Sequence, residues 1–368
     1  MDSSVFFGIS TLAYFIAMAV YIGFVAFRKN IISLIATTVT IFGFICQTAA
    51  LIIRWVDSYK FWVASAPTST MIESILRGAP LRNLYESLVF FVWALVLVHL
   101  IIEFKYKNRS LGAFVMPVAA LALAFIDVSG MSKEIEPLIP ALQSNWLLFH
   151  VFLSFTGYAA FAVSFAAAVA YLVLITESRN EKSYILWSIT VGIFIILLIA
   201  MGFDYASLSI GPEQDYIRSH FLKASFKSES LGVVVLSWIL SIAFIAVLWR
   251  FGVGLKKVLS ALSLKPGMLD EITYKSINVG FPLFTIGGVI MGAIWANSAW
   301  GTYWSWDPKE TWSLITWFIY AVYLHARYVA GWRGKKVAIL SLIGFIGVVF
   351  TYLGVNLFLS GLHSYGGS

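Results

Sequence analysis

From Trp146 to Ile175 the chain reads WLLFHVFLSFTGYAAFAVSFAAAVAYLVLI, a stretch without one Asp, Glu, Lys or Arg. As a helix it would be about 45 Å long at 1.5 Å per residue, whereas the hydrocarbon core of a bilayer is about 30 Å thick. A run this long and this apolar is typical of a membrane-spanning helix. The stretch therefore predicts an integral membrane protein.

Nine further apolar runs flank this one, and one of them is short for a span and contains Pro117. The nine are Val5 to Phe27, Ile31 to Ile53, Leu84 to Ile102, Leu111 to Val128, Tyr184 to Phe203, Leu231 to Phe251, Ile277 to Trp295, Thr311 to Tyr328 and Val337 to Leu359. We predict an all-α fold: a single membrane domain over residues 1–368, a polytopic bundle of about ten transmembrane helices.

The composition excludes a water-soluble domain of this size, because 60% of the 368 residues are hydrophobic and only 12% are charged. The net charge of +7 does not indicate a nucleic-acid partner, since the basic residues sit in short loops and form no stripe. Cys46 is the only cysteine, so any thiol chemistry must come from a partner. The first apolar run is too long for the core of a signal peptide, and we expect an uncleaved first helix.

Alternate connections between the runs differ in charge. One side collects sixteen of the twenty-five Lys and Arg residues: Arg28, Lys29, Lys105, Lys107, Arg109, Arg179, Lys182, Arg250, Lys256, Lys257, Lys265, Lys275, Arg327, Arg333, Lys335 and Lys336. The positive-inside rule makes this side cytoplasmic and places both termini outside. The outer connections are then Arg54 to Asn83, Ser129 to Asn145, Asp204 to Ser230, Ala296 to Lys309 and the tail after Leu359.

One outer connection is rich in tryptophan. Residues 295–312 hold five of the fourteen tryptophans, namely Trp295, Trp300, Trp304, Trp306 and Trp312. An aromatic belt at the membrane interface explains one or two of them. Five exceed what anchoring needs, and their broad faces and N–H donors favour a large, flat, apolar ligand.

The same stretch carries a helix-start signal. Asp307, Pro308 and Glu310 fit an N-cap, a proline at the first helical position and a capping-box acid. A ligand role for Asp307 is compatible with the cap, since a capped helix start holds the loop rigid. Lys309 could pair with a haem propionate, although a solvated or snorkelling lysine is the plainer interpretation.

Four of the five histidines lie in or at the end of an apolar run, where ionisable groups usually face a bundle interior or a cavity. His150 lies about 6 Å inside the outer end of its predicted helix, and His363 follows the last helix on the same side. Both therefore reach the level of the tryptophans, as two axial ligands of one haem iron require. His99 and His325 each lie near a cytoplasmic helix end and could share an inner haem site, or one ligand there comes from a partner subunit.

The fifth predicted helix also carries small residues at roughly helical spacing. Ser154, Gly157 and Ser164 could let a flat macrocycle approach, or they could serve helix packing. Both interpretations remain open at the level of sequence.

Taken together, these motifs resemble those of one family. Trp300-Gly301-x-x-Trp304-x-Trp306-Asp307-Pro-Lys-Glu-x-Trp312, Leu324-His325 and Leu362-His363-Ser-Tyr365 closely resemble the CcsA (ResC) subunit of system II cytochrome c synthases. Asn83-Leu-Tyr85-Glu86-Ser87 and Leu142-Gln-Ser-Asn-Trp146, which leads to His150, extend the resemblance over most of the chain.

The resemblance implies a holocytochrome c synthase subunit of the haem lyase type. Haem b would be both substrate and bound ligand, held by the tryptophan-rich segment with His150 and His363 as axial ligands. It would be presented to the CxxCH segment of apocytochrome c, whose thiols add to the vinyl groups. A CcsB (ResB) membrane subunit and a thiol-reducing partner are the implied partners, and lipid surrounds the complex.

The resemblance also implies a haem site within the membrane, to which His325 corresponds, with His99 or a partner residue as the second ligand. The implied location is the bacterial inner membrane, or the thylakoid membrane in plastid relatives, with the active face away from the cytoplasm. A haem exporter or relay without ligation activity is the alternative.

One segment departs from the compact eight-helix members of the family. Residues 184–251 are predicted as an extra transmembrane hairpin with an outer segment at 204–230. His220 lies in that segment, and we expect it to be a surface residue, with partner docking as the lesser alternative.

Overall fold

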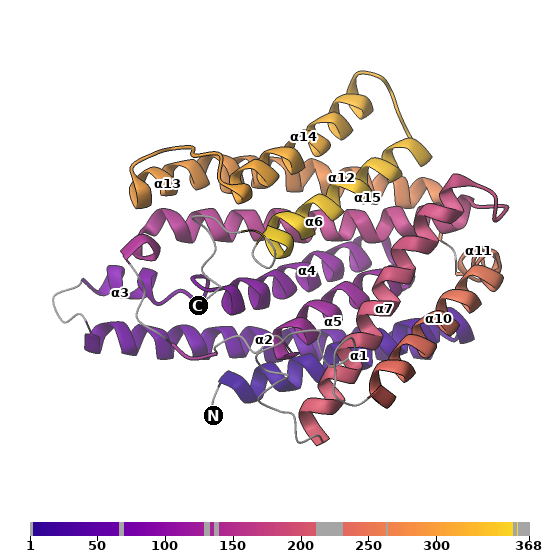
Figure 1. The fold of residues 1–368 in the computed structure, drawn as a ribbon, viewed down its shortest axis with the longest axis horizontal. Coiled ribbons are helices and arrows are strands. Elements are labelled where there is room, and N and C mark those ends of the chain that lie inside the picture. The colour runs from indigo at the N-terminus through magenta and orange to yellow at the C-terminus, as the bar shows by residue number, and fades with distance from the viewer. Residues whose placement is uncertain are drawn as a thin grey trace.

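The computed structural model describes residues 3–65, 70–128, 133–135, 140–210, 231–262, 264–355 and 359, and within these every regular element is a helix. Ten elements are long: α1 (Ser3–Phe27), α2 (Asn30–Ser65), α4 (Leu84–Tyr106), α5 (Gly112–Val128), α6 (Asn145–Ile175), α7 (Lys182–Ile210), α10 (Leu231–Phe251), α12 (Pro266–Phe284), α14 (Pro308–Tyr328) and α15 (Lys335–Val349) (Figure 1). Three are short: α3 (Met71–Arg77), α11 (Val253–Ser260) and α13 (Gly292–Trp300). Two 3₁₀ turns, η1 (Arg109–Leu111) and η2 (Pro140–Gln143), and two π-helical segments, η3 (Thr285–Met291) and η4 (Phe350–Gly354), complete the described chain.

The predicted membrane fold is confirmed. Nine helical stretches of the described residues are long and apolar enough to cross a bilayer. All ten predicted runs correspond to helices, and the one outside the nine is α14. This helix is rich in Trp, Tyr and Thr and ends with His325 and Arg327, which makes it less apolar than its neighbours.

Two helices extend far beyond their predicted spans. α2 continues to Ser65 instead of ending near Ile53, and α12, η3 and α13 form one unbroken helical stretch from Pro266 to Trp300. Hydropathy marks only the part of a helix that lies in hydrocarbon. The backbone hydrogen bonds of a helix continue into the headgroup region, where polar side chains are tolerated.

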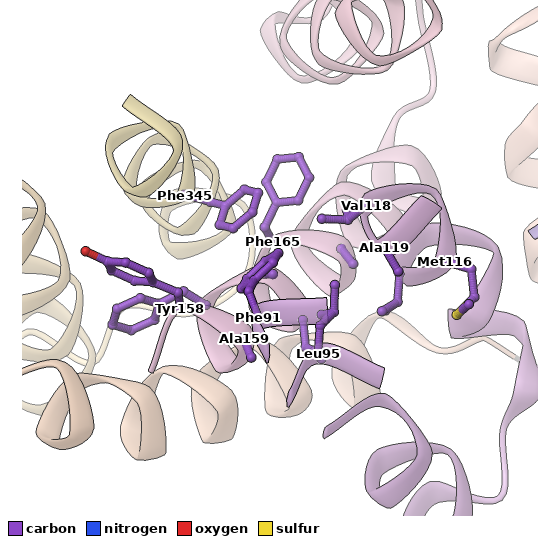
Figure 2. Packing of buried hydrophobic residues seen from close by; sticks show 14 of the residues in the cluster. Phe91, Leu95, Met116, Val118, Ala119, Tyr158, Ala159, Phe165 and Phe345 are labelled. Carbon is purple, nitrogen blue, oxygen red and sulfur yellow. The ribbon is translucent and has the colours of Figure 1, made fainter. Parts of the chain in front are cut away.

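α6 forms the centre of the bundle. Its span is 89% buried, and it packs against α4, α5, α12 and α15. Figure 2 shows part of this core, in which Phe165 of α6 lies near Phe345 of α15, with ring centroids 4.7 Å apart.

The small residues of α6 serve this packing. A Cβ at Gly157 would lie 3.1 Å from the Gly280 carbonyl oxygen of α12, so the two backbones approach closely, as in other small-residue contacts between membrane helices. The Ser164 hydroxyl hydrogen-bonds the Ser341 hydroxyl of α15 at 3.0 Å, and Ser154 donates to the His150 carbonyl of its own helix. The described contacts therefore favour the packing interpretation.

The bundle has two distinct ends (Figure 1). At one end lie α3, α13 and the start of α6, and we call it the tryptophan end. The turns after α1, α4, α6, α10 and α14 lie at the opposite end, which we call the basic end, because the predicted cytoplasmic Lys and Arg residues lie in these turns or in the helices beside them.

The predicted hairpin at 184–251 corresponds to α7 and α10. The helix α10 packs on α7 and α11, and only 11% of its span is buried. α7 runs on to Ile210, into the segment predicted to be an outer connection. His220 lies outside the described residues.

Candidate functional site

His150 lies in the second turn of α6, at the tryptophan end. Its Nδ1 is 2.8 Å from the carbonyl oxygen of Gly287 in η3. A carbonyl oxygen can only accept, so Nδ1 carries the hydrogen and donates it. In the neutral ring the lone pair is then on Nε2, the arrangement that protein metal sites commonly use to fix a ligating histidine.

The π-helical segment η3 and two glycines make this contact. A Cβ at Gly287 would lie 2.3 Å from Leu153 Cβ and 2.7 Å from the Ser154 backbone nitrogen. A Cβ at Gly292 would lie 3.0 Å from His150 Nδ1 and Cε1. Glycine at 287 lets η3 lie against the histidine-bearing turn of α6, and glycine at 292 spares the His150 ring a tight contact. π-Helical turns inside longer helices frequently occur at functional sites.

Four indoles continue the site outward from His150. The ring of Trp295 stacks on the His150 ring, with centroids 5.9 Å apart and planes 15° from parallel. Trp295 meets Trp300 edge to face at 4.9 Å, and Trp304 meets Trp306 edge to face at 5.8 Å. Trp295 is 2% exposed, whereas Trp306 is 68% exposed. The indoles near the half-buried His150 therefore range from the buried Trp295 to the open face of Trp306.

Trp304 has an unsatisfied donor. Its Nε1 is buried and has no hydrogen-bond partner in the described part of the chain. Buried indole N–H groups are normally paired, so this donor is an exception among the described residues.

The connection from α13 to α14 is short and strained. The predicted loop 295–312 is helical at both ends, and only residues 301–307 lie outside α13 and α14. Gly301 ends α13 with φ +79°, a conformation that glycine adopts without a Cβ penalty. Trp306 has φ +59°, which is uncommon for a bulky residue and marks a position held by its surroundings.

The predicted N-cap is confirmed. The Asp307 carboxylate accepts from the Lys309 backbone N–H at 2.9 Å, and Glu310 completes the capping box. Glu310 Oε2 also accepts from the Ser305 backbone N–H at 2.7 Å and from the Ser305 hydroxyl at 3.1 Å. The Glu310 carboxylate therefore fixes the strained segment beside Trp306.

The first turn of α14 contacts the end of the last described helix. Trp312 packs on Phe350 of η4 with centroids 4.1 Å apart. Lys309 Nζ lies 5.5 Å from the ring centroid of Tyr352. Burial lowers the pKa of the Lys309 ammonium to about 8, against the opposing effect of the Asp307 carboxylate.

Tyr352 also contacts α4. Its hydroxyl is 2.5 Å from the Ser87 hydroxyl and 3.3 Å from the Leu84 carbonyl oxygen. The Asn83–Ser87 motif, the start of α14 and η4 therefore meet at one tyrosine.

Two arginines join further motif segments to this end. Arg82 donates to the carbonyl oxygens of Leu142 at 2.5 Å and Leu76 at 2.9 Å, which fixes the approach to α6 and so to His150. Arg54 Nε lies 2.8 Å from Glu86 Oε1 in a buried ion pair between α2 and α4.

The structure does not bring His99 and His325 together. His99 is fully buried on α4, edge to face with Tyr21 of α1 at 5.7 Å. His325 is exposed on α14, and the helices α6 and α12 lie between α4 and α14 (Figure 1). His363 lies outside the described residues.

Sequence reasoning did not identify the π-helical segment, Tyr352 or Arg82 as parts of this site. A signal was present for the first, because Gly287, Gly288 and Gly292 interrupt an apolar run. Nothing in the sequence distinguished Tyr352 from the other sixteen tyrosines.

Comparison with known proteins gives consistent matches. Residues 81–363 match the family model described as Cytochrome C assembly protein. The chain is 36% identical over 357 residues to a Cytochrome c biogenesis protein CcsA of Gloeobacter violaceus, covering 96% of this chain and 93% of that one. It is 37% identical over 368 residues to the protein of that name from Nostoc punctiforme, covering 96% and 94%. It is 35% identical over 347 residues to the protein of that name from Mesostigma viride, and the match covers 92% of this chain and 88% of that one.

Proposed function

This chain belongs to the cytochrome c assembly protein family, and on that premise we propose that it binds haem b at its tryptophan end and presents it for attachment to apocytochrome c. A role in cytochrome c biogenesis follows from the relatives named CcsA. The observation that carries the haem proposal is the stack of His150 on Trp295, with His150 Nδ1 bound to the Gly287 carbonyl oxygen.

The site fits a haem in three respects. His150 is held in the tautomer that leaves Nε2 as the ligating nitrogen. Trp304 offers a buried, unsatisfied N–H within the described residues, and Tyr303 and Trp306 present exposed aromatic faces, 61% and 68% exposed. A flat apolar macrocycle with polar edges matches such a surface.

The second axial ligand is proposed to be His363. Before His363, the structure describes the chain without a gap as far as Val355, which follows η4, and then describes only Leu359. η4 itself contacts Trp312 and α4 at the tryptophan end. Seven residues separate Val355 from His363, so the proposal needs only a short connection from η4.

The chain's own residues would act by positioning. Thioether formation adds a cysteine S–H across a vinyl double bond, so that sulfur bonds to one carbon and the proton to the other, without net oxidation. Holding the two groups together can lower the barrier by about 7–11 kcal/mol. The capping box of Asp307 and Glu310 and the contact of Lys309 with Tyr352 keep the aromatic surface rigid for this purpose.

We also propose that a CcsB/ResB-type subunit covers His325. This exposed histidine shares a stripe with Phe318 and Val322 of α14 and with Val329 directly after that helix, which are 55%, 52% and 73% exposed. An ionisable side chain facing lipid is costly, so a partner helix and a haem ligated by His325 would account for it. Since His99 is enclosed elsewhere, the second inner ligand would come from that subunit.

The proposed location is a bacterial-type cytoplasmic membrane, with the basic end towards the cytoplasm and the tryptophan end on the other side. The apocytochrome and a thiol-reducing partner would then act at the outer face.

The test is purification of the full chain with a co-expressed CcsB/ResB-type subunit. The complex should absorb in the Soret region and mature a reporter cytochrome c. His150→Ala and Trp295→Ala should reduce both signals, whereas Trp332→Phe, at an exposed tryptophan of the basic end, should leave both unchanged. Equal haem content in all variants would refute the site.

A second assay separates synthesis from relay. The haem-loaded complex is incubated with a reduced CxxCH peptide, and covalently bound haem is measured after acid extraction. Covalent product supports the synthase assignment, and haem that transfers but stays extractable supports the relay.

A further inference from the structure

The connection from α10 to α12 is strongly basic. From Arg250 to Lys265 the chain has four Lys or Arg residues and no Asp or Glu. Elsewhere at the basic end a cation can lie directly against a carboxylate, as Arg327 Nη2 does at 2.8 Å from Asp270 Oδ2. The connection from α10 to α12 therefore carries positive charge that its own sequence does not balance.

α11 holds this charge at the surface of the bundle. One side of the helix is buried, since Leu259 is 2% exposed and the helix contacts α1 and α6. On another side Lys257 is exposed, and a Cβ at Gly254 would meet nothing within 4 Å. Residues three apart are neighbours on a helix surface, so open space lies beside Lys257. A helix with one apolar and one basic side is typical of the membrane interface.

The end of α10 brings an apolar surface up to this charge, and Figure 1 shows α10 meeting α11 at the basic end. Only 11% of the α10 span is buried. Phe244, Val247 and Phe251 recur at three- and four-residue spacing and are 52%, 55% and 64% exposed. The guanidinium carbon of Arg250 lies 5.3 Å from the Phe251 ring centroid. The apolar side chains therefore end beside a cation.

The cations of this surface differ in how they are paired. Lys256 Nζ lies 3.4 Å from Glu177 Oε1, so part of its charge is already compensated. Arg250 and Lys257 form no ion pair within the described part of the chain. Arg179 adds a further positive group, because its guanidinium donates to the Arg250 carbonyl oxygen at 2.5 Å. Arg250 and Lys257 are thus the cations that an anionic ligand would meet.

We propose that this surface binds an anionic phospholipid of the leaflet at the basic end, with the phosphate held by Arg250 and Lys257 and an acyl chain along Phe244, Val247 and Phe251. Gly252 joins the two helices with helical dihedrals, φ −57° and ψ −33°, so the surface from Phe244 to Lys257 is about 20 Å long. A dissolved anion would use only its cationic end. A phospholipid supplies the charge and the apolar chain in one molecule.

The experiment is native mass spectrometry of the purified full chain without haem, so its outcome does not depend on the proposed function. Phosphatidylglycerol and phosphatidylcholine with the same acyl chains are added in equal amounts, and the wild type should retain phosphatidylglycerol in preference. Arg250→Gln/Lys257→Gln should lower this preference by about 5-fold for each charge removed, the effect of one basic residue near an anionic leaflet. Arg333→Gln/Lys336→Gln removes the same charge from exposed residues around the start of α15 and should leave the preference intact.

Two further measurements complete the test. Arg250→Lys/Lys257→Arg keeps both charges and should bind as the wild type does. Glycerol phosphate carries the anionic group without acyl chains and should not displace the bound lipid. Equal retention of both lipids by the wild type would overturn the proposal and leave the surface to a helix of another membrane protein. Equal loss in the two glutamine variants would overturn it in favour of net charge, and displacement by glycerol phosphate would do so in favour of a free phosphate site.

Discussion

His150, which is half-buried, and His99, which is fully buried, occupy opposite kinds of environment. At the tryptophan end, His150 donates from Nδ1 to the Gly287 carbonyl oxygen and stacks on Trp295. Near the basic end, His99 faces the Glu103 carboxylate at 3.4 Å. The carbonyl takes the hydrogen of His150 Nδ1 and leaves Nε2 as the ligating nitrogen, whereas the His99 ring is fully buried and covered edge to face by Tyr21. The contacts of a membrane histidine therefore distinguish the two positions more sharply than their depth does.

The largest effect should come from replacing His150, with His99 as the comparison. His150→Ala should lower reporter cytochrome c by at least about 10-fold, the lower bound seen when even the supporting shell of a metal ligand is lost. Added imidazole should restore part of the Soret absorbance, because it can occupy the vacated space. His99→Gln should retain the Soret absorbance of the purified complex, and an equal loss in both variants would end the contrast between the sites.

The next effect concerns the close contact that orients His150. Gly287→Ala brings a Cβ within 2.7 Å of the Ser154 backbone nitrogen, so η3 must move away from α6. We expect a destabilisation of about 1–3 kcal/mol from overpacking, together with loss of haem. Thermal unfolding in detergent measures it, with Gly267→Ala as the matched control, since nothing lies within 4 Å of a Cβ there.

The cap of α14 should contribute less. Asp307→Ala removes the acceptor for the Lys309 backbone N–H and should cost about 0.5–2 kcal/mol. Asp307→Asn keeps an acceptor oxygen and should recover most of that stability. If both variants unfold at the wild-type temperature, the loop beside Trp306 is held by other contacts.

The smallest effect should be a pH dependence at Lys309, in the first turn of α14 ahead of the apolar run 311–328. Burial lowers its folded pKa to about 8, whereas an unfolded lysine titrates near about 10.4. Between these values the unfolded chain binds more protons, so stability should rise with pH from about 8 to about 10.4. Below about pH 8 Lys309 is charged in the folded state as well, so folding there bears the full free-energy cost of burying the ammonium.

Unfolding midpoints across this pH range test the effect. Lys309→Met should flatten the rise. Lys60→Met, at a lysine whose side chain is 71% exposed, should leave it intact. If the rise in stability persists in Lys309→Met, another ionisable group causes it.

Much of the fold was predictable from sequence, because a membrane helix is a local property of about twenty apolar residues. The cap at Asp307 was equally local and was predicted correctly. The ends of α2 and α13 were not, since a helix that leaves the hydrocarbon keeps its backbone bonds while its hydropathy falls.

The site was less predictable for a different reason. Depth alone made His99 and His325 look like a pair, and it could not show that α6 and α12 separate their helices. The acceptor for His150 is a backbone carbonyl of a π-turn, and a carbonyl carries no residue-specific signal in the sequence.

The π-helical segment has one more consequence. Each π-turn accommodates an additional residue, and one residue of a regular helix corresponds to a rotation of about 100°. η3 thus sets the direction in which Trp295 and Trp300 point around the helix axis, relative to α12. Deleting a single residue from 285–291 would swing both indoles about a quarter-turn around the helix axis and carry Gly292 away from His150, so the direction of the aromatic surface and the contact with the histidine are set by the same register.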